Sequence, residues 1–130
     1  MGLDMYLFGV KEESNMHNYD IGKVSTQIEI GYWRKASQIH RWFVKNVQKG
    51  VDNGATYYVS RENLKTLKNL CEEVLIEPKR AEVLLPLSDG FFFGNTGYDE
   101  KYFHNIQKTI EICRYALEKN FDYFVYQSSW

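Results

Sequence analysis

The sequence has only two cysteines, two prolines and no long apolar run. Cys71 and Cys113 lie in separate apolar helical patterns, with no second Cys or His at metal-ligand spacing. We therefore expect buried, reduced thiols, and neither a disulfide nor a metal site. The longest uncharged apolar run, residues 83–87, is far shorter than the roughly 20 residues that cross a bilayer. Residues 1–6 resemble no secretory or myristoylation signal, so we expect a cytoplasmic protein without a membrane partner.

Neither sign of charge dominates the chain. Sixteen Lys and Arg against seventeen Asp and Glu give a net charge of -1, whereas a general binder of long nucleic acid carries a large positive field. Any anion site must therefore be local. The motifs GxSxG, HExxH and the Walker lysine are also missing. We accordingly name no catalytic residue and no cofactor, and we favour a protein without enzymatic activity while leaving that question open.

The length of 130 residues suits a single domain spanning 1–130. Period-two alternation predicts strands at residues 3–8, 24–32, 55–59, 90–94 and 123–126, and helical spacing predicts helices at residues 33–49, 61–75 and 98–120. Residues 9–23 are polar and predict a long loop, either simply solvated, which is favoured, or serving as a lid. Residues 79–87 fit either a helical turn or a buried strand. The order predicts an α+β fold, with one mostly antiparallel sheet of four to five strands packed against three helices.

The helix predicted at residues 33–49 has an unusual distribution of charge. It carries five cations and no carboxylate, namely Arg34, Lys35, Arg41, Lys45 and Lys49. On a helical wheel Trp42 falls among these cations, away from the apolar side. Such a face suits a solvated surface with Trp42 covered by the long loop or by Trp130, a platform for a nucleotide, or an interface with an acidic protein through Arg41, Trp42 and Lys45.

Two further segments offer candidate functional residues. Gly90, Gly94 and Gly97 precede the last predicted helix, where backbone N–H groups could meet an anion, which makes Asn95, Thr96 and Tyr98 candidate contacts. The alternative is a tight turn in which Thr96 or Asp99 caps the helix. His40 lies on the apolar side of its helix, where a hydrogen-bonded core role is favoured. It could act as a general base only if a carboxylate oriented it, and none is adjacent in sequence.

Several segments resemble a widespread group of small proteins encoded by tailed bacteriophages and prophages. These are MGLDMYL at residues 1–7, YWRKA at 32–36 followed by Ile39, His40 and residues 42–44, and GFFFG at 90–94. The resemblance implies a phage accessory protein that acts in the host bacterial cytoplasm, such as an inhibitor of host defence. It could sequester a cyclic nucleotide immune signal of the CBASS or Thoeris type. Alternatively, it could bind a defence protein such as a CRISPR effector, or act as a small enzyme on a nucleotide.

The sequestration hypothesis assigns roles to particular residues. Tyr32 or Trp33 would stack on a base, and Arg34 and Lys35 would pair with phosphates. Asn95 or Thr96 would read a base edge or a sugar. The chain also contains ten Tyr, eight Phe and three Trp, more rings than a small core needs, so we expect a homo-oligomer that covers some of them.

Overall fold

The computed structural model describes residues 2–14, 23–87 and 98–130. Its elements are β1 (Asp4–Ser14), β2 (Lys23–Arg34), α1 (Ser37–Asn46), β3 (Tyr57–Val59), α2 (Arg61–Ile76), η1 (Pro78–Arg80), α3 (Ala81–Leu84), α4 (Glu100–Glu118) and β4 (Tyr123–Ser129). The strands form one antiparallel sheet in the order β2-β1-β4-β3. The predicted α+β fold is thus confirmed, with one short helix, α3, beyond the three that were predicted.

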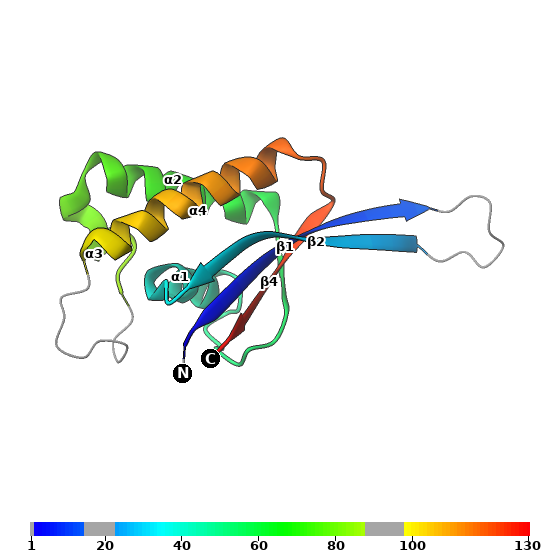
Figure 1. Ribbon diagram of the computed structural model, residues 1–130, viewed down its shortest axis with the longest axis horizontal. Coiled ribbons are helices and arrows are strands. Elements are labelled where there is room, and N and C mark those ends of the chain that lie inside the picture. Colours follow the sequence, from blue (N-terminus) through cyan, green and yellow to red (C-terminus); the bar gives the residue numbers. More distant parts are fainter. Residues whose placement is uncertain (1, 15–22, 88–97) are drawn as a thin grey trace.

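The core lies between the inner face of the sheet and the helices. Met5 and Leu7 of β1 point inward, as does Leu3 just before the strand, and all three are fully or almost fully buried. From α1, the ring of Phe43 stacks on Tyr126 of β4 with the centroids 3.9 Å apart. Figure 1 shows α2 and α4 side by side, with α1 nearer to the strands. All helices in the described part of the chain therefore share one side of the sheet.

The outer face of the sheet holds many of the surplus rings. Tyr6 lies between Phe8 and Tyr32, with ring centroids 6.2 and 5.2 Å away, and Tyr58 lies 5.6 Å from Tyr123. Tyr58 is 63% exposed and the other four rings are half-buried. In the described part of the chain, a helix reaches this face at its β2 edge, where Lys108 of α4 lies over the Tyr32 ring.

The predicted loop at residues 9–23 is wrong at both ends. β1 continues to Ser14 and β2 begins at Lys23, so both strands extend beyond the helices as a long ribbon (Figure 1). Strand pairing satisfies the backbone hydrogen-bonding groups whatever the side chains are, so a polar composition wrongly predicted a loop here. Gly9 also packs tightly, because a Cβ there would lie 2.7 Å from the Phe121 ring. Residues 15–22 lie outside the described residues.

The predicted start of the first helix is also wrong. Trp33 and Arg34 still belong to β2, where they pair with Met5 and Asp4. The chain then turns at Lys35, whose φ of 56° is left-handed and whose N–H donates to the Leu3 carbonyl at 2.7 Å. Helix α1 therefore begins only at Ser37.

Trp42 belongs to the buried core, contrary to its predicted exclusion from it, although its cover is neither the 9–23 loop nor Trp130 among the described residues. Its side chain is 7% exposed, and its ring packs edge-on against Phe43 with centroids 5.2 Å apart. The helical wheel placed Trp42 among cations correctly, but it could not show that α3 and the chain after it cover this side of α1. Leu84 and Leu85 share a hollow with Trp42.

The remaining elements follow their sequence signals more closely. Ser60 and Asn63 form a reciprocal capping box at the start of α2. Asp99 caps α4, as one of the two predicted alternatives requires, by accepting from the N–H groups of Lys101 and Tyr102. Residues 79–87, undecided from sequence, contain most of η1 and all of α3. The predicted strand at 90–94 lies outside the described residues.

Candidate anion-binding site

Helix α4 runs alongside the edge strand β2, and three contacts hold the two together. The Trp33 indole N–H donates to Thr109 Oγ1 at 2.8 Å. A Cβ on Gly31 would lie 2.7 Å from Ile112 Cγ2, so only glycine allows this approach. Lys108 Nζ lies 5.5 Å from the centroid of the Tyr32 ring, a cation–π contact at the sheet edge. The pairing of Gly31, Tyr32 and Trp33 with α4 positions the next residue of β2, Arg34.

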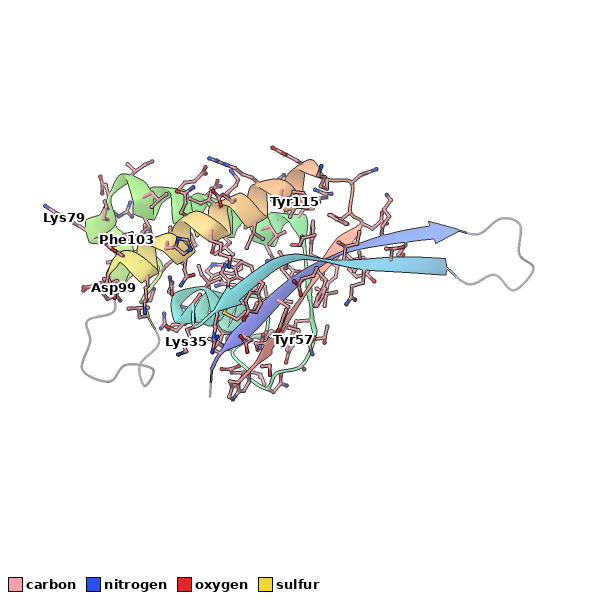
Figure 2. The ribbon with its side chains drawn as sticks, viewed as in Figure 1. Lys35, Tyr57, Lys79, Asp99, Phe103 and Tyr115 are labelled. Atoms are coloured by element: carbon pink, nitrogen blue, oxygen red, sulfur yellow. The ribbon has the colours of Figure 1, made fainter. Side chains whose placement is uncertain are left out.

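Arg34 and the first half of α4 line an open hollow of about 420 Å³. We call it the Arg34 hollow; its lining residues are Arg34, Glu100, Lys101, His104 and Asn105. The α4 residues recur at helical spacing, so their side chains share one face of the helix. Figure 2 shows Asp99 at the start of α4 and Lys35 just after the end of β2, the two chain segments that meet here.

The Arg34 hollow has an excess of positive charge. Within the described residues, neither Arg34 nor Lys101 forms an ion pair within 4.0 Å, whereas Lys65 and Lys68 of α2 each pair with a glutamate. Lys35 lies beside Arg34, since a Cβ on Gly2 would lie 3.7 Å from Arg34 Nε and 3.8 Å from Lys35 Cε, but it is not among the lining residues. Glu100 is the only carboxylate that the described residues contribute to the lining. An anion would therefore meet more opposite than like charge.

The two predicted stacking rings have different surroundings. Trp33 is fully buried and its N–H is bonded to Thr109, so it offers no face to a ligand that enters from solvent. Tyr32 is half-buried, and its hydroxyl donates to Asp4 Oδ1 at 2.6 Å. This hydrogen bond raises the pKa of Tyr32. Of the two rings, only Tyr32 reaches the surface near the Arg34 hollow.

Tyr98 and the interface candidates Arg41, Trp42 and Lys45 do not line this hollow. Tyr98 packs 5.1 Å from the Tyr102 ring, and its hydroxyl accepts from the Leu87 N–H at 3.2 Å. Asn95 and Thr96 lie outside the described residues. Arg41, Trp42 and Lys45 line a separate hollow of about 230 Å³ between α1, α2 and α3, which we call the Trp42 hollow. The candidate residues of the first cationic segment thus divide between two sites.

His40 is the middle member of a hydrogen-bonded chain from Tyr126 to Asp52, which we call the buried relay, and it is not an accessible catalytic group. Its Nε2 lies 2.9 Å from Asp52 Oδ1 and its Nδ1 lies 2.7 Å from the Tyr126 hydroxyl. A carboxylate can only accept, so Nε2 carries a proton, and in the neutral ring the Tyr126 hydroxyl then donates to Nδ1. Burial raises the pKa of Tyr126, which keeps its hydroxyl a donor. With 3% exposure and both nitrogens bonded, His40 has no position left for a substrate.

Besides Glu100, three residues of the Arg34 hollow were missed from the sequence: Lys101, His104 and Asn105. A signal was present, because these positions and Lys108 form an i, i+3, i+4, i+7 polar stripe on one helix. Nothing in the sequence shows that this stripe faces the end of β2, about 70 residues earlier in the chain. Asp52, the partner of His40, was missed because a loop brings it back from twelve residues away.

Comparison with protein-family models, curated proteins and solved structures gave no match. Among residues 2–14, 23–87 and 98–130, no group of three or more His, Cys, Asp or Glu could hold a metal ion. No helix in the same ranges has the length and hydropathy needed to span a membrane.

Proposed function

We propose that this protein binds a small nucleotide, of the cyclic immune-signal type, and sequesters it without chemical change. The observation that supports the proposal is the Arg34 hollow, in which cations from two separate elements surround about 420 Å³. That volume falls within the roughly 300–1,000 Å³ of small-molecule sites. Sequestration needs affinity alone, so it requires no nucleophile or general base.

The residues of the hollow suit the parts of a nucleotide. The Arg34 guanidinium can bind a phosphate through two parallel N–H groups, and Lys101 adds a mobile point charge. The Asn105 amide offers both a donor and an acceptor for a sugar or a base edge. Beside the hollow, Tyr32 offers a ring on which a base can stack, although its hydroxyl already donates to Asp4.

The biological setting is also a proposal. It rests on the resemblance to tailed-phage proteins, which implies an inhibitor of host defence in the bacterial cytoplasm. The alternative of a small nucleotide-acting enzyme receives no support from His40, whose ring nitrogens are both occupied. The alternative of a protein-binding inhibitor has an observation of its own in the Trp42 hollow, where exposed cations lie beside an apolar wall.

A ligand panel with product recovery tests the proposed function. Purified protein is heated with cyclic di-AMP, cyclic di-GMP, cyclic GMP-AMP, cyclic tri-AMP or ADP-ribose, and the ligand is then recovered and analysed. A true ligand at a hundredfold excess over its Kd should stabilise the fold by about 2.7 kcal/mol and return unchanged. The variant Arg34→Gln/Lys101→Gln should lose this stabilisation, whereas Lys65→Gln/Lys68→Gln should keep it. Absence of stabilisation by every member would refute the proposal, and an altered ligand would indicate an enzyme.

We also propose that the protein is a homo-oligomer. The aromatic outer face of the sheet supports this, since rings such as Tyr58 are otherwise left in water. Light scattering at the concentration used for the ligand panel should give a mass above one chain. A monomer mass under those conditions would contradict the proposed assembly without affecting the nucleotide proposal.

A further inference from the structure

The Trp42 hollow has a composition unlike that of the Arg34 hollow. Its lining combines apolar, amide and cationic side chains: Gln38, Arg41, Trp42, Lys45, Asn46, Thr66, Leu70, Val83, Leu84, Leu85 and Pro86. They come from α1, α2, α3 and the residues directly after α3, so the hollow is a junction of three helices. Two internal hydrogen bonds hold its amides, from Gln38 Nε2 to the Tyr102 carbonyl and from Asn46 Nδ2 to the Trp42 carbonyl.

The charge of the Trp42 hollow has one sign only. Arg41 and Lys45 are exposed and lie one helical turn apart on α1. No carboxylate lines the hollow, and neither cation forms an ion pair within 4.0 Å in the described part of the chain. Arg80 and Arg114, at other points of the helical layer, each have a glutamate partner. The hollow therefore complements an acidic group.

The size and the apolar wall of the hollow restrict its occupant. A volume of about 230 Å³ is smaller than the roughly 300–1,000 Å³ typical of sites that enclose whole small molecules. Val83 at the wall is 76% exposed, and Leu70 and Leu84 are only partly buried. An exposed apolar wall beside Trp and Arg is typical of the anchor pockets at protein interfaces, which receive single side chains.

We infer that the Trp42 hollow binds an acidic peptide segment of a partner protein, with one apolar side chain against Leu70 and Val83 and an adjacent carboxylate on Arg41 and Lys45. Such a segment would supply a partner for both the cations and the apolar wall of the hollow. Among the residues that the structure describes, this site shares no lining residue with the Arg34 hollow. The two proposals can therefore fail separately.

N-acetyl-leucine is a minimal probe of this site, because it joins one isobutyl group to one carboxylate. Titrated into uniformly ¹⁵N-labelled protein, it should shift the Trp42 indole resonance and the amides of residues 41–46 and 83–85. The shifts should saturate with a Kd on the order of 1 mM, the affinity expected for a ligand of this size. The uncharged N-acetyl-leucinamide should bind about tenfold more weakly because it lacks the carboxylate.

Variants separate the peptide site from non-specific attraction. Arg41→Glu/Lys45→Glu should abolish the saturable shifts, whereas Lys65→Glu/Lys79→Glu, which makes the same change of net charge elsewhere, should preserve them. Equal binding to both variants, shifts that do not saturate, or no shift at the hollow would overturn the proposal. Titration with AMP provides the remaining comparison. Saturable shifts at the Trp42 hollow with AMP but not with N-acetyl-leucine would show that this site takes nucleotides and not peptides.

Discussion

Replacement of Asp52 by alanine tests whether the buried relay on His40 supports the fold. The Asp52 carboxylate accepts from the His40 imidazole at 2.9 Å, and His40 is 3% exposed. Hydrogen bonds to charged groups contribute about 1.5–3 kcal/mol, but the Asp52 side chain is 42% exposed, which lowers that figure. The substitution also leaves a buried N–H without its partner. We therefore expect Asp52→Ala to lower the free energy of unfolding by about 1–2 kcal/mol.

Urea unfolding followed by circular dichroism measures this loss. For a chain of this length the expected change corresponds to a fall in Tm of roughly 3–10 °C. Asp52→Asn keeps an acceptor oxygen and should lose less than Asp52→Ala. Glu82→Ala, at an exposed position, is the control and should stay within about 0.5 kcal/mol of wild type. If Asp52→Ala were as stable as Glu82→Ala, the relay would contribute nothing and the interpretation of His40 would be wrong.

Three further predictions concern the packing and backbone around the sites. Gly31→Ala places a Cβ 2.7 Å from Ile112 and should lower the free energy of unfolding in urea by about 1–3 kcal/mol. Adding Ile112→Ala should partly relieve this loss. Strictly additive losses in the double variant would refute the contact. Burial raises the pKa of Cys113 from 9.0 to about 12, so the thiol ionises at lower pH in the unfolded chain than in the folded one. The free energy of unfolding should therefore fall between pH 9 and 12, by up to about 1.4 kcal/mol per pH unit. Cys113→Ala should show a shallower slope. Lys49→Gly should raise the stability by about 0.5–1 kcal/mol, because Lys49 has a φ of 55°; a loss of stability would contradict that backbone strain.

The elements that sequence analysis predicted well have signals contained within one segment. In α2, the capping residue Ser60 and the inward positions Leu64, Leu67, Cys71 and Val74 all follow from local spacing, and the structure buries all four. β4 likewise begins at Tyr123, as alternation predicts. Such signals need no knowledge of the rest of the chain.

The errors arose where local signals overlap or where distant segments decide the outcome. Trp33 fits the helical spacing of the residues after it, yet pairing with Met5 retains it in β2. Trp42 was placed on a polar surface because its cover comes from α3, in a segment that its sequence left undecided. The Arg34 hollow depends in the same way on the packing of α4 against β2. Single-segment patterns could predict Arg34 as a candidate, but not its neighbours Lys101 and His104.

Isothermal titration calorimetry of Arg34→Gln tests the anion site most directly. The titrant is the panel member that stabilises the wild-type protein most, and Lys65→Gln is the control. The account predicts an affinity for Arg34→Gln at least about tenfold below that of wild type, as the loss of one charge-assisted phosphate contact requires, and an unchanged affinity for Lys65→Gln. Wild-type affinity in Arg34→Gln would contradict the assignment of the Arg34 hollow as the nucleotide site.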